Sequence, residues 1–219
     1  MSAVHPCEVP LNTMLRSYKD GPGYADCYVT EVQGAITQEI FIEAFYTSPL
    51  FKVERTILKY LASRPATNAE AKQLAAGNAT KFSAWRIERQ STSELLLADV
   101  TGRTRSWLMA TPGTGSATAP STFLYFGSAV VPRAGHGTTN PSMGWPFHAL
   151  SGFHRLYSRL LLSAASRRVA SAQQNAAWWQ KVSMWMPAHR DVDGLDAMTG
   201  QASLFKGSVH KPPKTSATD

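Results

Sequence analysis

The sequence predicts an α+β fold in which a curved antiparallel sheet wraps around a long C-terminal helix. A strand and several helical segments come first, and from residue 81 the apolar period changes from helical spacing to two. Short polar turns join the successive strand-like runs, which favours antiparallel hairpins. Neither Gly nor Pro occurs between Gly152 and Pro187, so one long helix can follow the sheet. The strands need a covered face and the helix needs its apolar stripe buried, which indicates that they pack together.

The first strand is expected over residues 26–34, where β-forming side chains alternate until Gly34 ends the run. Helical spacing begins in residues 37–46, where apolar residues recur three and four positions apart. Thr37 is a suitable N-cap for this helix. The sequence therefore predicts a strand followed directly by a helix.

Two more helices are indicated before the sheet continues. Ser48 at a cap position and Pro49 at the first helical position begin one of them, and its apolar stripe extends to Leu61. Thr67 and Glu70 form the sequence pattern of a capping box and begin a shorter one.

Four β-rich runs then form the predicted meander, and a Gly- and Pro-rich connector leads to Pro146, which opens the long helix. The runs cover residues 81–90, 94–100, 104–112 and 122–132.

One globular domain with additional segments is the simplest organisation for 219 residues of which 43% are hydrophobic and 17% charged. We expect an N-terminal segment over residues 1–23, the main domain over 24–170, a Trp-rich helical extension over 171–186 and a flexible tail over 187–219. Its two cysteines, Cys7 and Cys27, form no recognisable framework, so we expect free thiols in a reducing compartment. No leader-like or membrane-spanning stretch is present, and a cytoplasmic location is expected.

The net charge of +7 is concentrated in one part of the chain. Nine Lys and Arg residues and no Asp or Glu lie between Val100 and Arg190. That stretch cannot supply a pair of carboxylates for acid–base chemistry, and it should attract anions. Alternatively, its arginines only solvate the surface. The standard nucleotide, hydrolase and zinc motifs are absent, so we expect no cofactor and no metal.

Five runs of the chain resemble, in the same order, a bacterial family of uncharacterised proteins that belongs with the helix-grip, START-like (SRPBCC) superfamily. The resemblance covers about residues 24–169 and carries no catalytic residue over. It implies a deep, largely apolar cavity between the sheet and the long helix, with a few polar groups at its end. The runs are YADCYVTEVQG (24–34), FYTSPLFKVERTILKYL (45–61), GRTRSWLM (102–109), LYFGSAVVP (124–132) and FHRLYSRLLLSAA (153–165).

Two polar side chains lie on or beside the apolar stripe of the long helix. His154 and Tyr157 are three residues apart and therefore share a side. A histidine there can move protons near neutral pH or bind a ligand. The alternative is that His154 is a hydrogen-bonded residue of the core.

Aromatic and basic residues alternate onto single faces of two strands. Arg105 and Trp107 share one face, and Phe123 and Tyr125 share another. We expect these faces to point inward, so that the rings line the cavity and Arg105 binds a carboxylate or phosphate. If they point outward, the same residues are surface or interface residues, and Trp85 has the same ambiguity.

The function expected from these features is the binding of an apolar, acidic small molecule between sheet and helix. One rival is a cyclase or dehydratase in which His154 moves protons with help from Tyr157 or Tyr125, while Arg105 holds the substrate. Another is a module that binds an anionic membrane surface or a protein partner through its arginines and through Trp178, Trp179 and Trp185. The tryptophan segment could instead fold back on the domain. Specific nucleic-acid binding is not expected, because the basic residues are sparse and no binding motif accompanies them.

Overall fold

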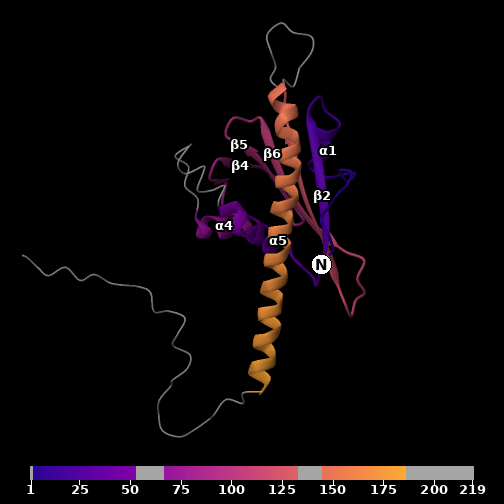
Figure 1. The fold of residues 1–219 in the computed structure, drawn as a ribbon. Coiled ribbons are helices and arrows are strands. Elements are labelled where there is room, and N and C mark those ends of the chain that lie inside the picture. The colour runs from indigo at the N-terminus through magenta and orange to yellow at the C-terminus, as the bar shows by residue number, and fades with distance from the viewer. Residues whose placement is uncertain (1, 53–66, 133–144, 186–219) are drawn as a thin grey trace, which may run out of the picture. The chain divides into compact units, whose positions relative to one another are not determined.

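The computed structural model describes residues 2–52, 67–132 and 145–185 (Figure 1). The predictions for the tail, for most of the connector and for residues 53–61 of the second helix lie outside these ranges. The chain divides into two units, residues 1–179 and 180–219, and the sheet belongs to the first of them.

The described strands form one seven-stranded antiparallel sheet with the order β1-β2-β7-β6-β5-β4-β3. This confirms the predicted α+β class, the first strand and the later meander. The strands are β1 (His5–Pro6), β2 (Tyr24–Gln33), β3 (Lys81–Phe82), β4 (Trp85–Gln90), β5 (Glu94–Asp99), β6 (Thr104–Pro112) and β7 (Ser121–Val130).

Three of the predicted helix starts, at Thr37, Ser48 and Thr67, are confirmed by their capping contacts. The Thr37 hydroxyl accepts a hydrogen bond from the Ile40 amide, and Thr67 and Glu70 form the reciprocal capping box. The Ser48 hydroxyl likewise accepts from the Phe51 amide at 3.3 Å. The described helices are α1 (Arg16–Lys19), α2 (Gln38–Tyr46), α4 (Asn68–Ala75) and α5 (Trp145–Trp185), and residues 49–52 begin a further helix.

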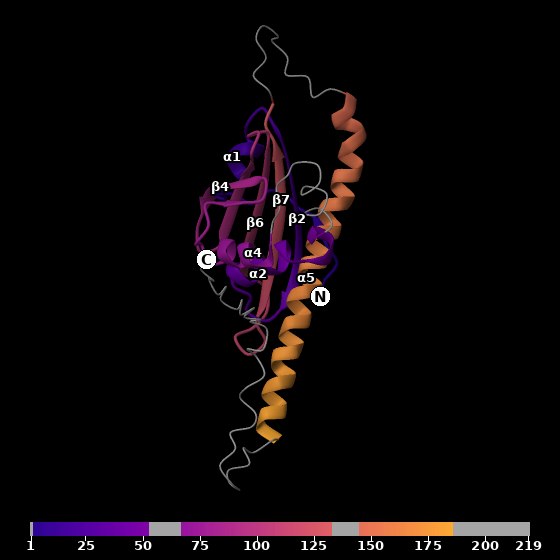
Figure 2. The same ribbon diagram turned by 90° about the vertical axis from the view of Figure 1, so that its left-hand side faces the viewer.

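The part of α5 that includes residues 157–169 packs on one face of the sheet, and α2 and α4 cover another part of the same face (Figures 1 and 2). Aromatic rings occupy the centre of this core, with Phe45 4.9 Å from Phe126 between ring centroids. The α5 side chains that enter it are apolar and recur with helical spacing. They are Leu161, Leu162, Ala165 and Val169.

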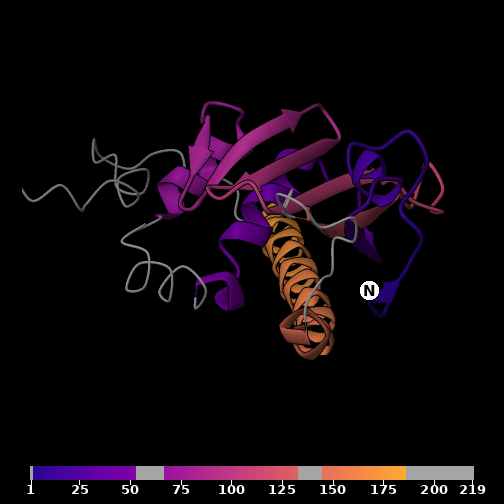
Figure 3. The same cartoon turned by 90° about the horizontal axis from the view of Figure 1, so that it is seen from above.

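The opposite face of the sheet is covered by residues 7–18, which lead into and include most of α1. Val9 and Leu15 are buried there against Trp107 and Met109 of β6. Figure 2 shows α1 and α5 on opposite sides of the strands, and Figure 3 shows α5 end-on with the sheet to one side of it. The central strands are therefore buried on both faces.

Gly127 of β7 lies where Leu15 of the N-terminal segment packs closely on the sheet. A Cβ atom there would lie 2.4 Å from Leu15 Cδ2 and 2.8 Å from the backbone oxygen of Asp26. We predict that Gly127→Ala lowers the free energy of unfolding by about 1–3 kcal/mol, because overpacking forces the segment away. Urea denaturation measures this, with the exposed Thr92→Ala as a control. A change below about 0.5 kcal/mol would contradict this packing.

Candidate functional site

Three polar side chains lie side by side on the sheet face that α5 covers. The register pairs Asp26 of β2 with Ser128 of β7, and Ser128 with Ser106 of β6. Ser128 and Ser106 are buried, and the Asp26 side chain is only 11% exposed. The next row towards the sheet centre is apolar, with Phe126 beside Leu108. The sheet face below α5 therefore has a polar part and an apolar part.

His154 of α5 completes this polar cluster. Its Nε2 atom lies 2.7 Å from Ser128 Oγ and 3.7 Å from Asp26 Oδ2, and Ser128 Oγ donates a hydrogen bond of 2.7 Å to Asp26 Oδ1. The hydroxyls of Tyr24 and Tyr28 each donate to Asp26 Oδ2 at 3.4 Å. One buried carboxylate thus holds residues from two strands and a helix.

The surroundings of Asp26 keep its carboxyl ionised. Burial alone would raise its pKa, but hydrogen bonds from His154 and Ser128, together with the charge of His154, lower the pKa below its usual value. Burial and the nearby Asp26 carboxylate raise the pKa of the Tyr28 phenol, and the same two causes raise that of Tyr24. Both phenols therefore remain protonated donors at neutral pH.

The directions of these hydrogen bonds limit the chemistry. Ser128 gives its proton to Asp26, so its oxygen accepts from His154 Nε2 rather than passing a proton to it. Activation of a serine nucleophile needs the reverse direction, in which the serine donates to the histidine. The cluster orients His154 through its Nε2 atom, and the His154 side chain is 35% exposed.

Three of the predicted ligand-binding residues lie on the α5-facing side. His154 belongs to the polar cluster, while Trp85 and Tyr157 are partly buried against the core between the sheet and the helices. His154 is hydrogen-bonded, as the alternative supposed, but its side chain is 35% exposed and does not belong to the core.

The other four predicted residues point away from α5, and the expected inward orientation of their strand faces is wrong. Trp107 and Tyr125 belong to the cluster beneath the N-terminal segment, and Phe123 lies beside Tyr125 with their ring centroids 6.3 Å apart. Arg105 shares the face of Trp107. The N-terminal segment buries this face, so an aromatic strand face did not indicate a cavity.

Arg105 and Trp107 also have partners for their polar atoms within the protein. Arg105 Nε lies 2.6 Å from Glu88 Oε2, and its Nη1 donates to the carbonyl of Gly102 at 2.8 Å. Trp107 Nε1 donates to Glu94 Oε2 at 2.8 Å. These contacts attach the N-terminal segment, because Tyr18 donates a hydrogen bond to Glu88. Arg105 therefore pairs with groups of the protein itself, whereas the sequence led us to expect that it binds the carboxylate or phosphate of a ligand.

Asp26, Ser128 and Ser106 were missed by the sequence reasoning. Each lies in a strand that carries other polar residues as well, so none of them stands out in the sequence, and only the pairing of β2, β7 and β6 brings them into one row. The signal available in the sequence was their spacing. Each lies two residues from Tyr28, Phe126 or Leu108 of its own strand, and residues two apart in a strand lie on the same sheet face.

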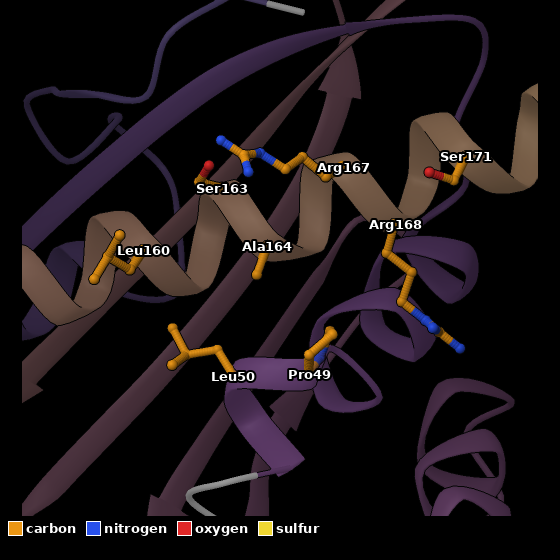
Figure 4. Close-up of a pocket in the computed structure, with 8 residues that line it drawn as sticks. All are labelled: Pro49, Leu50, Leu160, Ser163, Ala164, Arg167, Arg168 and Ser171. Carbon is orange, nitrogen blue, oxygen red and sulfur yellow. The ribbon is translucent and has the colours of Figure 1, made fainter.

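A groove of about 520 Å³ lies between α5 and the start of the helix at residue 49 (Figure 4). Arg168 extends from α5 towards α2, and Arg167 lies on the other rim beside Ser163 (Figure 4). Neither arginine forms an ion pair with another described residue. The lining consists of Pro49, Leu50, Leu160, Ser163, Ala164, Arg167, Arg168 and Ser171.

A second groove of about 370 Å³ follows on the next turns of α5 and shares Arg168 and Ser171 with the first. Glu43 of α2 lines it and lies 3.8 Å from Lys72 Nζ. The charge along the side of α5 therefore changes from basic to mixed beyond Arg168.

The tryptophan segment is described only in part. Trp178 is 56% exposed, and the side chains of Trp179 and Trp185 lie outside the described residues. Among the described helices, none combines the length and apolarity needed to cross a membrane. Within the same ranges, no three His, Cys, Asp or Glu side chains gather as ligands for a metal ion.

Comparisons with protein-family models, with curated proteins and with solved structures find no match for this chain.

We predict that Asp26→Asn lowers the free energy of unfolding by about 1–3 kcal/mol at pH 7, since it removes a buried charged acceptor. The lowered pKa of Asp26 means that the ionised carboxyl stabilises the fold above its unfolded pKa of about 3.9, and that this contribution is lost as pH falls through the lower folded pKa. The difference between variant and wild type should therefore shrink between pH 5 and pH 2.

Urea denaturation across this pH range provides the test. The exposed Glu8→Gln serves as the control, since no hydrogen bond or ion pair of Glu8 is described. A difference for Asp26→Asn that stays constant with pH would contradict the proposed ionisation.

Proposed function

We propose that the chain has a START-like, helix-grip fold and binds an amphipathic, acidic small molecule along the side of α5. The element order supports the fold assignment: after β1 and α1, the strand β2, helices, five further strands and a long helix follow one another. The strand order places β2 beside β7 and leaves β3 at the far end of the sheet, with α5 across one face. The helix-grip resemblance of residues 24–169 agrees with this arrangement.

The groove beside α5 carries the functional proposal. Its volume of about 520 Å³ is within the range of small-molecule sites, roughly 300–1,000 Å³. Leu50, Leu160 and Ala164 supply an apolar wall, and the eight described lining residues include two arginines and no carboxylate. An apolar chain with an acidic end matches this distribution.

The position of the acid follows from the charges. Arg168 lines both grooves and is exposed, so its guanidinium can donate two parallel hydrogen bonds to a carboxylate. Glu43 in the second groove repels an anion further along α5. We therefore place the acidic group at Arg168, with Arg167 at the rim and the apolar part against Leu50 and Leu160.

The polar cluster is less suited to an acidic group. Asp26 is a buried carboxylate there, and a second anion beside it would be repelled at low dielectric. Residues 100–190 contain basic residues but no Asp or Glu, which is the reason for expecting an acidic ligand. Arg167 and Arg168 belong to this stretch and line the groove.

The same cluster favours a second candidate, a dehydratase in which His154 transfers the proton. Incubation with a 3-hydroxyacyl thioester, followed by mass spectrometry, tests this hypothesis. Loss of water that His154→Ala abolishes would support it, and an unchanged thioester would count against it.

Binding of dodecanoate tests the leading proposal. We predict that wild-type protein binds dodecanoate and that Arg168→Ala weakens binding about tenfold or more, because a charge-assisted hydrogen bond contributes roughly 1.5–3 kcal/mol. Arg167→Ala should have a smaller effect, because Arg167 lies at the rim. Isothermal titration calorimetry measures both.

Two controls distinguish binding at Arg168 from nonspecific electrostatic attraction of the anion to the protein. Arg86→Ala removes an equal charge from an exposed position on β4 and should leave the affinity unchanged. Dodecanol lacks the acidic group, so wild-type protein should bind it more weakly than it binds dodecanoate. Wild type and Arg168→Ala should bind dodecanol with equal affinity. Equal binding of dodecanoate by wild type and Arg168→Ala would contradict the site.

A further inference from the structure

The only two cysteines of the chain face each other on neighbouring segments. The register pairs Pro6 of β1 with Tyr28 of β2, so the next residues inward are Cys7 and Cys27, and the Cys7 amide donates to the Cys27 carbonyl at 2.9 Å. Their Sγ atoms lie 3.0 Å apart. Residues opposite each other in antiparallel strands have Cα atoms about 4.5–5.5 Å apart, which falls within the range that a disulfide spans.

The two thiols differ in access to solvent. Cys27 is 2% exposed, whereas Cys7 is only partly buried. The hydrogen bond between the thiols lowers the pKa of Cys7 and raises that of Cys27, since the proton kept by one stabilises the thiolate of the other. Cys7 is thus the thiol that an external reagent reaches first, and Cys27 is placed to react with it afterwards.

Most of the segment between the two cysteines covers the sheet face opposite α5. Leu15 of this segment is buried against the sheet, and the Met14 amide donates to Glu94 Oε2 at 2.7 Å. Tyr18 donates to Glu88, which also binds Arg105. A disulfide between Cys7 and Cys27 would join the two ends of this segment and close it into a covalent loop.

We propose that Cys7 and Cys27 are a reversible oxidation site for small disulfides of the glutathione class, and that oxidation fastens the N-terminal segment to the sheet. In the first step the Cys7 thiolate attacks one sulfur of glutathione disulfide, which forms a mixed disulfide and releases one glutathione thiolate. In the second step Cys27 loses its proton to solvent and attacks Cys7 Sγ, which releases the second glutathione. Two protein thiols are oxidised, and one glutathione disulfide is reduced to two thiols.

Titration of the intact protein with reduced and oxidised glutathione tests this inference. We expect oxidation to remove two hydrogen atoms from the mass of the monomer and to abolish both reactive thiols. The melting temperature should rise by about 5–10 °C, because the crosslink restricts the unfolded chain. After trypsin cleavage at Arg16 or Lys19 the two fragments should stay joined until a reductant is added.

Two single variants keep the test independent of folding defects. Cys27→Ala should stop at the mixed disulfide and gain one glutathione, because no second thiol remains to displace it. Cys7→Ser should react slowly, because Cys27 is buried. Neither should gain thermal stability on oxidation through an internal crosslink. Two free thiols in excess glutathione disulfide, a crosslinked dimer as the product, or an oxidised monomer with an unchanged melting temperature would each overturn the proposal.

Discussion

The central strands of the sheet carry apolar side chains on both faces, and each face therefore needs its own cover. Leu95, Leu96 and Leu97 of β5 are all 0% exposed although neighbours along a strand point to opposite sides. Burying both faces removes a large apolar area from water. Helices α2, α4 and α5 cover one face, and residues 7–18 cover the other.

This double burial limits where the proposed ligand can bind. The N-terminal segment contacts Trp107 on the outer face, and aromatic rings such as Phe45 and Phe126 occupy the core on the inner face. The grooves that Arg168 lines lie along the side of α5 instead. The polar cluster around Asp26 then acts as an anchor, because it ties β2, β7 and α5 together through His154.

Local signals were sufficient to predict the elements, and long-range packing was needed to place the site. Thr37, Ser48 and Thr67 mark helix starts through contacts within one turn, so their pattern is visible in the sequence. The alternation in β6 predicts two faces but not which one α5 covers, since Trp107 and Leu108 are both fully buried. Which face α5 covers depends on where residues 7–18 pack, and the alternation of residues along a strand does not indicate this. The row of Asp26 and its serine partners depends on strand pairing in the same way.

A crystal structure of the protein with dodecanoate tests the proposed ligand site most directly. We predict that the carboxylate lies within hydrogen-bonding distance of the Arg168 guanidinium, and that the alkyl chain lies against Leu50, Leu160 and Ala164. A carboxylate bound at His154, or an alkyl chain buried between Trp107 and the N-terminal segment, would contradict this placement.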